Sequence, residues 1–176
     1  EWKRDTQLVL YRISGKSPFT ALVGKLLPQT LVFWLIAILY AVCFYRYLQF
    51  PCNSGILPMI LIGMLTVLGA QGLAAFIFGV CGQMRLSMCL CSLWGILSFS
   101  LAGFTFPVTA MDGILQKLSV LFPLRHYYLL YVNQALNGYS IVYAWHSLLA
   151  MVVFAMLQLL TLRHYHSLFL NHKYVP

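Results

Sequence analysis

Residues 86–106, LSMCLCSLWGILSFSLAGFTF, form an apolar run that contains no charged side chain and ends at Pro107. A short amphipathic segment follows, and a second break at Phe122-Pro123-Leu124 leads into an aromatic-rich stretch that continues to Tyr139. A run of about 20 apolar residues is long enough to cross a bilayer as a helix. Breaks at membrane depth are tolerated where protein or water satisfies the freed backbone groups. This stretch therefore predicts a membrane-spanning helix followed by a re-entrant helical hairpin over residues 107–139.

The composition of the whole chain indicates the same class. Of its 176 residues, 61% are hydrophobic and only 8% are charged, whereas soluble domains carry about 25% charged residues. We expect an all-α, polytopic transmembrane helical bundle over residues 29–176, with a cytosolic tail over residues 163–176. Because the chain begins at Glu1 without a signal-peptide pattern, we interpret it as part of a longer protein. Four runs have the length of a membrane span: residues 31–48, 56–80, 86–106 and 141–162.

Basic residues indicate how these four spans are oriented. With both chain ends on one side of the membrane, that side carries eight lysine and arginine residues and the opposite side carries three. Cytosolic loops are enriched in these residues, so we expect both ends in the cytosol. The net charge of +8 follows from this bias and from attraction to anionic lipid, and it requires no nucleic-acid partner. The eight are Lys3, Arg4, Arg12, Lys16, Lys25, Arg85, Arg163 and Lys173, and the three are Arg46, Lys117 and Arg125.

The first 28 residues differ from the rest of the chain. Residues 1–6 include several charged side chains, and a short apolar stripe over residues 8–13 follows. Ser17 suits a helix N-cap with Pro18 at the first helical position, and a second short helix is expected to end before Pro28. This pattern predicts an amphipathic elbow on the cytosolic membrane surface. Periodicity leaves two roles open for it, an interfacial anchor and a docking surface for a soluble partner.

Residues for chemistry are sparse. The only acids are Glu1, Asp5 and Asp112, so general acid–base catalysis has few options. No acid lies inside a span, which disfavours proton coupling. A membrane-embedded enzyme that uses His126 remains the rival interpretation, and a non-transporting membrane assembly subunit is another.

Cofactor sites are equally poorly supported. Gly15-Lys16-Ser17 resembles the end of a phosphate-binding loop, but Leu10 stands where that motif requires a glycine. The five cysteines are an odd number and lie mainly in or beside apolar runs, which fits small apolar fillers better than a disulfide framework. We therefore expect that this chain binds no metal or cofactor.

Two stretches resemble one transporter family, the permease subunits of type-2 ATP-binding-cassette (ABC) exporters. The first is similar to the segment that couples the family's permease to its ATPase, although Asp5 replaces the glycine usual before Thr6. It comprises Glu1, Lys3, Thr6, Leu10, Ser17, Leu22, Gly24, Lys25, Leu27 and Pro28. The second, Gly103-Phe104-Thr105-Phe106-Pro107 followed by Met111, Leu115, Leu118, Pro123, Leu124 and Tyr127 or Tyr128, is similar to the family's outer hairpin. There Asp112-Gly113 and Phe122 depart from the family's usual Met-Pro and Asn.

The resemblance implies the last four spans of such a permease and an ATP-driven exporter in the bacterial inner membrane. ATP and Mg would be bound by a separate nucleotide-binding subunit, and a second permease protomer, identical or not, would complete the path. The cargo is expected to be amphipathic or hydrophobic, such as a drug-like, lipid or glycan-linked molecule. Residues expected to couple to the ATPase are Glu1, Lys3, Arg4, Thr6, Leu10 and Lys25. Expected outer-gate residues are Gly103, Phe104, Phe106, Pro107, Pro123, Tyr127 and Tyr128. Candidates for the path lining are Thr66, Gln71, Phe76, Ser98, Ser100 and Phe104.

Overall fold

A computed structural model describes residues 18–81, 83–104 and 107–160, and in this part of the chain all regular structure is helical. The long elements are α2 (Pro18–Val42), α3 (Ile56–Cys81), α4 (Met84–Leu101) and α7 (Trp145–Leu160), with α5 (Gly113–Ser119) and α6 (Pro123–Tyr131) between the last two. Two π-helical turns, η1 (Cys43–Tyr47) and η3 (Val132–Leu136), extend α2 and α6, and two 3₁₀ turns, η2 (Val108–Ala110) and η4 (Ile141–Ala144), precede α5 and α7. The predicted all-α bundle is confirmed.

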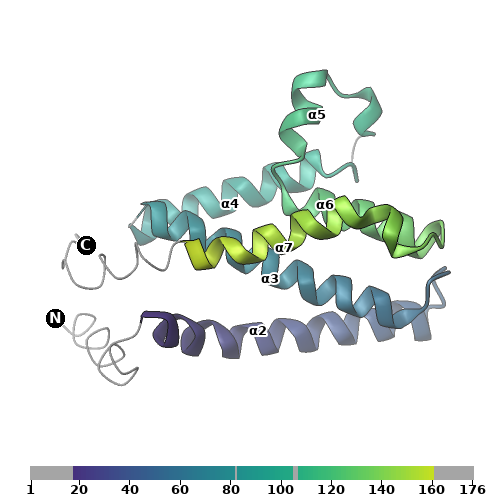
Figure 1. Cartoon of the computed structure of the whole chain (residues 1–176), viewed down its shortest axis with the longest axis horizontal. Coiled ribbons are helices and arrows are strands. Elements are labelled where there is room, and N and C mark those ends of the chain that lie inside the picture. Colours follow the sequence, from purple (N-terminus) through teal and green to yellow (C-terminus); the bar gives the residue numbers. More distant parts are fainter. Residues whose placement is uncertain (1–17, 82, 105–106, 161–176) are drawn as a thin grey trace.

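Helix α3 is the centre of the bundle. It contacts α2, α4, α6 and α7, most extensively α7, and it runs diagonally behind α7 in Figure 1. The buried core between α3, α6 and α7 is formed by Met59, Ile62, Leu130, Ala135, Ala144 and Met151. Helix α2 begins and α7 ends at the same end of the bundle, and α5 projects sideways near the opposite end (Figure 1). We call that opposite end, which carries residues 48–55 and 137–140, the loop end.

Small residues make the α3–α7 contact possible. Gly69, Gly72, Ala75 and Gly79 are all buried on α3, and spacings of three or four residues place them on one helix face. Without side chains between them, two helix backbones can approach closely in a membrane. The sequence pattern of small residues in residues 56–80 is therefore used for packing against α7.

Three described helices are long and apolar enough to cross a membrane: Leu26–Tyr47, Ile56–Cys81 and Ile141–Leu159. The expected span over residues 86–106 corresponds to a shorter apolar helix, Arg85–Leu101. Helix α4 ends where Gly103 takes a positive φ of 103°, a conformation that favours glycine. The expected helix over residues 86–106 is thus too long at its C-terminal end.

Pro28 does not separate two helices as the sequence predicted. Helix α2 continues through it as one element. Proline removes one backbone hydrogen bond from a helix interior, but an apolar segment in lipid has no other way to satisfy its remaining backbone groups. Most large side chains of α2 are exposed in the isolated chain, as Leu35 (64%) and Leu39 (65%) illustrate. This face is suited to lipid or to another membrane segment.

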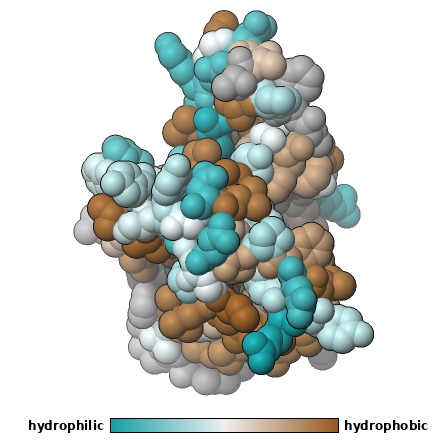
Figure 2. All heavy atoms as spheres, turned by 90° about the vertical axis from the view of Figure 1, so that its right-hand side faces the viewer, coloured by the Kyte–Doolittle hydropathy of each residue, from teal (hydrophilic) through white to brown (hydrophobic). Residues whose placement is uncertain are grey.

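The loop end is polar at its centre. Figure 2 looks onto it and shows hydrophilic residues crossing the end face, with hydrophobic residues on the flanks. Such a distribution fits an end of the bundle that meets water while its sides meet lipid.

Candidate functional site

Two grooves lie along α3, one on the side of α2 and the other on the side of α4. One is enclosed by α2, α3 and α6 and has a volume of about 270 Å³, and the other is enclosed by α3, α4 and α6 and has a volume of about 250 Å³. We call them the α2 groove and the α4 groove. Thr66 and Ala70 line both, so the two grooves meet at the middle of α3.

The walls of the α2 groove are apolar because the facing residues are small. Gly63 of α3 faces Ala37 of α2, since a Cβ added at Gly63 would lie 3.8 Å from Ala37 Cβ, an ordinary contact distance. Thr66 lines the floor, but its Oγ1 donates to Ile62 O at 2.7 Å and so has no free proton to offer an occupant. The apolar lining residues are Ala37, Ala41, Met59, Gly63, Val67 and Ala70.

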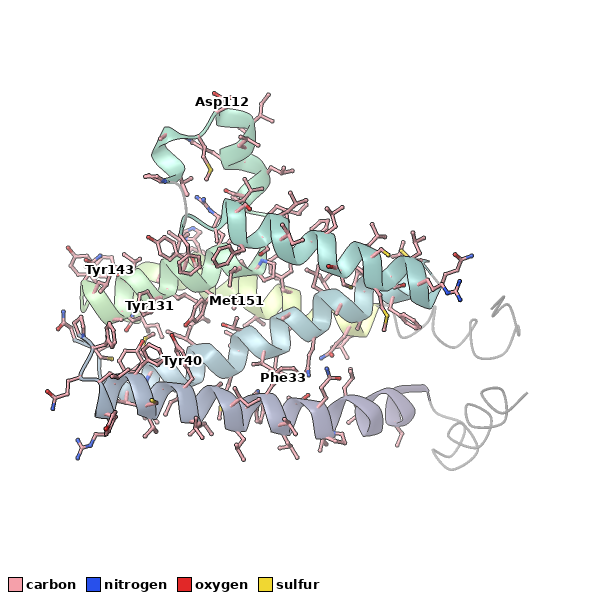
Figure 3. All side chains as sticks on the ribbon, turned by 180° about the vertical axis from the view of Figure 1, so that it is seen from behind. Phe33, Tyr40, Asp112, Tyr131, Tyr143 and Met151 are labelled. Carbon is pink, nitrogen blue, oxygen red and sulfur yellow. The ribbon has the colours of Figure 1, made fainter. Side chains whose placement is uncertain are left out.

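Four tyrosines close the α2 groove toward the loop end, and we call them the tyrosine cluster. They are Tyr40 on α2, Tyr45 on η1, and Tyr127 and Tyr131 one turn apart on α6. Tyr40, Tyr45 and Tyr127 line the groove together, and the Tyr127 and Tyr131 ring centroids are 6.5 Å apart. Figure 3 shows Tyr40 and Tyr131 in the same region between α2 and α6. Within the described residues, no hydrogen bond occupies any of the four hydroxyl groups.

Polar contacts hold α2 against α3 on the other side of the groove. Trp34 Nε1 donates to Met64 O at 3.3 Å. Thr30 Oγ1 lies 2.8 Å from Leu26 O and 2.8 Å from the side-chain amide of Gln71. The Thr30 hydroxyl has a single proton, so it can donate to only one of these two groups. All three groups are satisfied when Thr30 donates to Leu26 O and Gln71 turns its Nε2 toward Thr30 Oγ1. This orientation also provides a partner for Nε2, which is otherwise buried and unpaired.

Among the described residues, the α4 groove has one aromatic residue, Trp94, in its lining. Trp94 lines it beside Ser98 and Pro123, and the Trp94 ring packs against Phe122 with 5.0 Å between centroids. Trp94 Nε1 is buried and has no hydrogen-bond partner in the described part of the chain. A buried donor without a partner costs about 1–3 kcal/mol, so an acceptor near this indole would be stabilising.

The candidate path-lining residues occupy different environments. Thr66 lines both grooves and Ser98 lines the α4 groove. Gln71 contacts α2 through Thr30, while Phe76 lies half-buried on α3. Ser100 is exposed on α4, and its Oγ donates to Ile96 O at 3.1 Å. Their role in a path stays a prediction.

Part of the expected outer gate forms one cluster where α4 ends. Phe104 packs against Tyr128 with ring centroids 4.6 Å apart, and against Phe99 at 5.9 Å. Gly103 faces the same tyrosine, since an added Cβ would lie 3.2 Å from Tyr128 Cε1. This cluster joins the end of α4 to α6.

The other expected gate residues lie elsewhere. Tyr127 comes one residue before Tyr128, so its side chain lies about 100° around α6 from that of Tyr128. It lines the α2 groove instead. Pro123 is buried at the start of α6 and lines the α4 groove, while Pro107 is exposed as the N-cap residue of η2. Phe106 lies outside the described residues. The predicted gate is therefore divided between two faces of α6.

A network of hydrogen bonds joins the two loops at the loop end, and we call it the loop latch. Asn53 N donates to Ala135 O at 3.1 Å, and Asn53 Nδ2 donates to Leu136 O at 2.8 Å. Ser54 Oγ donates to Gln134 Oε1 at 2.6 Å, and Gln134 Nε2 donates to Tyr139 O at 3.0 Å. The α2–α3 loop is thereby fixed to the turn between α6 and α7.

His126 is buried on α6, where its ring lies 6.1 Å from the ring of Phe154 on α7, and it is not arranged for catalysis. Its Nε2 lies 2.9 Å from Val120 O, and a carbonyl only accepts, so Nε2 carries the proton. Burial lowers the pKa of His126, the Val120 hydrogen bond opposes this, and neighbouring Arg125 lowers it further. Asp112 does not pair with it, since it is exposed at the tip of the hairpin, away from the bundle (Figure 3). The structure gives no support to the embedded-enzyme interpretation.

Five of the expected ATPase-coupling residues, Glu1, Lys3, Arg4, Thr6 and Leu10, lie outside the described residues. The sixth, Lys25, falls within α2, which continues without a break to the loop end. A sequence model of the ABC-2 family transporter proteins matches residues 1–162.

The chain belongs to the ABC-2 transporter family.

No curated protein and no solved structure matched the chain. Family membership and the membrane-spanning helices together make this ABC-2 protein an integral membrane transport permease, in a family whose membrane domain has no ATPase site of its own. Its described residues contribute grooves, an aromatic cluster and a loop latch, none of which requires an ionised side chain.

Several residues of this ABC-2 site were missed by sequence reasoning. They are Tyr40 and Tyr45 of the tyrosine cluster and Asn53, Ser54 and Gln134 of the loop latch. Tyr127 and Tyr131 could be placed together from the sequence, because they are four residues apart and share a helix face. For the latch, nothing in the sequence pairs positions about 80 residues apart.

Proposed function

We propose that this ABC-2 permease exports amphipathic or hydrophobic cargo, driven by a nucleotide-binding subunit that holds ATP and Mg. A second permease protomer would complete the path. The observation that carries the cargo class is the chemistry of the two grooves: among the described residues, their lining includes no Asp, Glu, Lys, Arg or His. An uncharged apolar surface cannot compensate the desolvation of a charged cargo, but it suits molecules with a large apolar part.

Helix α2 supports the proposed coupling. The segment expected to meet the ATPase, from Glu1 to Lys25, leads directly into this helix. One continuous helix carries a displacement from its first turn to its last without a loop to absorb it. Its far end, with η1, carries Tyr40 and Tyr45 of the α2 groove. A push on the segment would therefore change the α2 groove.

The proposed setting is the inner membrane of a bacterium, with both ends of this chain in the cytosol. The bias of basic residues toward that side supports the orientation. ATP supply in the cytosol fits a coupling segment on the same side.

A pull-down from native membranes tests the proposal. The full-length protein is captured after gentle extraction, and co-purifying ATPase activity is measured for the wild type, for Lys3→Ala/Arg4→Ala, and for Arg163→Ala/Lys173→Ala in the expected cytosolic tail as a matched control. We expect an ATPase with the wild type and the control, and at least a fivefold loss with Lys3→Ala/Arg4→Ala. ATP-dependent uptake of a hydrophobic fluorescent dye into inverted vesicles then tests direction. Absence of any ATPase would favour a membrane assembly subunit, and dye movement out of the vesicles would exclude export.

A further inference from the structure

The tyrosine cluster and the α2 groove together have the chemistry of a site for one chain of an amphipathic molecule. Four tyrosines gather at one end, three in the groove lining and the fourth, Tyr131, beside Tyr127. Tyr40, Tyr45 and Tyr127 line the groove itself, and its remaining walls are apolar. Each hydroxyl can donate one hydrogen bond and accept others. The site thus offers hydrogen bonds at one end and only apolar contact along its length.

The walls exclude a polar occupant over most of the groove. Among the described residues, Thr66 is the only polar side chain in the lining apart from the tyrosines, and its proton is used by Ile62 O. Placing a polar group against such a wall without a hydrogen bond costs about 1–3 kcal/mol or more. In the part of the chain that the structure describes, no cation lines the groove to compensate a buried phosphate or carboxylate.

The length of the groove matches one leaflet of a bilayer. It extends along α3 from Met59 to Ala70, which at 1.5 Å per residue is about 16 Å. Half of a hydrocarbon core about 30 Å thick is about 15 Å. Because Met59 lies near the start of α3 at the loop end and Ala70 lies near its middle, the groove covers the leaflet next to the loops.

We propose that the α2 groove binds one acyl chain of an ester lipid from this leaflet, with the ester carbonyl accepting hydrogen bonds from the tyrosine cluster. The ester lies at the boundary between hydrocarbon and headgroup, where the hydroxyls stand, and the chain extends toward Ala70. The charged headgroup stays in the interface, outside the groove. This inference depends on the membrane location of the protein and is independent of export.

Photo-crosslinking in vesicles tests this site. The full-length protein is reconstituted with a trace of phosphatidylcholine that carries a diazirine on its acyl chain, and crosslinked residues are mapped by mass spectrometry. A dialkyl ether analogue, which has the same chains but no ester carbonyl, is the matched probe. We expect crosslinks concentrated at residues 37–45 and 59–70, and severalfold fewer with the ether probe.

Variants separate the groove from ordinary lipid contact. Ala41→Leu fills the groove and is expected to reduce these crosslinks at least threefold. Leu39→Phe, a size increase at a side chain 65% exposed on α2, is expected to leave them unchanged. Tyr127→Phe removes one hydroxyl and should reduce the difference between the ester and ether probes. If Ala41→Leu does not fold, Gly63→Ala takes its place, because its added Cβ meets Ala37 Cβ at an ordinary 3.8 Å.

Three outcomes would overturn the proposal. One is labelling spread evenly over the exposed faces of α2 and insensitive to Ala41→Leu. Another is equal labelling by the ester and ether probes in the wild type. The third is a groove that yields no lipid crosslinks because another protein segment or a second protomer covers it. None of these results bears on the ATPase pull-down, so failure of this site and failure of export are distinguishable.

Discussion

A side chain on Gly72 of α3 would occupy the position of the Phe154 carbonyl oxygen on α7. The backbones of the two helices meet there without an intervening side chain, and Ala155 is also within contact distance of that position. Gly69, three residues earlier, faces Met151 and Phe154 on the same helix. The principal contact of the bundle therefore depends on the absence of side chains at particular positions of α3.

Replacing Gly72 by alanine is expected to destabilise the protein although alanine favours helix formation. Overpacking a tight contact costs about 1–3 kcal/mol or more, because Phe154 O belongs to the backbone and cannot rotate away. Gly95→Ala on α4 is the control, since no atom lies within 4 Å of its added Cβ. It is expected to be neutral or to gain about 0.4–1 kcal/mol. Thermal unfolding in detergent compares the two, and equal midpoints would contradict the packing described.

The loop latch predicts a non-additive pair of substitutions. Gln134→Ala leaves Ser54 Oγ and Tyr139 O without their partner and is expected to cost about 1–3 kcal/mol. Ser54→Ala is expected to cost about 0.5–1.5 kcal/mol, and the double variant little more than Gln134→Ala alone, because both changes remove the same bond. Ser92→Ala, at an exposed serine of α4, is the control with no expected effect. Full additivity would show that the Ser54–Gln134 bond contributes nothing.

His126 predicts loss of stability on acidification. Its pKa is lowered in the fold by burial, from an ordinary value of 6.5, so the unfolded chain takes up the proton more readily. The stabilisation by neutral His126 is therefore fully present above pH 6.5 and is lost as the pH falls through the lowered pKa. His126→Gln is expected to reduce this pH dependence, because glutamine keeps an N–H for Val120 O and does not titrate. Unfolding midpoints between pH 7.5 and 5 check this, and parallel curves would exclude the effect.

Cysteine labelling tests which loops share a side of the membrane. Cys52 lies in the α2–α3 loop, where burial raises the pKa of its thiol and a backbone hydrogen bond of Gly55 opposes this rise. In a background with the other cysteines replaced, a membrane-impermeant maleimide is expected to label it from outside the cell, slowly at neutral pH and faster as the pH rises.

The control reports the opposite side of the membrane. Gln83 is exposed in the turn between α3 and α4, and Gln83→Cys in a chain without Cys52 is expected to react only after the membrane is permeabilised. Labelling of Gln83→Cys in intact cells would reverse the proposed orientation.

Apolar length decided what could be predicted about the fold. The span predicted over residues 56–80 agrees with α3, Ile56–Cys81, to within one residue, because its limits are set by the water-exposed ends of a membrane helix. Pro28 was misjudged, since proline's cost in a helix is smaller than that of leaving the helix in lipid. The end of α4 was misjudged because apolar residues continue past Gly103, where the backbone changes direction.

The site was less accessible to prediction because its contacts join distant positions. Tyr40 and Tyr127 meet only through the way α2, α3 and α6 cross, which places Ala37 of α2 opposite Gly63 of α3. Tyr127 and Tyr128 are adjacent in the sequence and were treated as one aromatic pair. In the helix their side chains lie on different faces, Tyr127 at the α2 groove and Tyr128 against Phe104. Thr66 and Ser98 were identified as candidates from their polarity alone, and both lie at a groove.

Helix α4 is shorter than the hydrocarbon core of a typical bilayer is thick. Its 18 residues span about 27 Å, whereas the 26 residues of α3 span about 39 Å. Lipids beside α4 meet an apolar wall slightly shorter than a hydrocarbon core of about 30 Å, and bilayers thin locally to match such a wall. Helix α5 projects sideways beside the end of α4 (Figure 1). We therefore expect the membrane to be thinnest beside α4, where the path between the two aqueous phases along the surface of this protein is shortest.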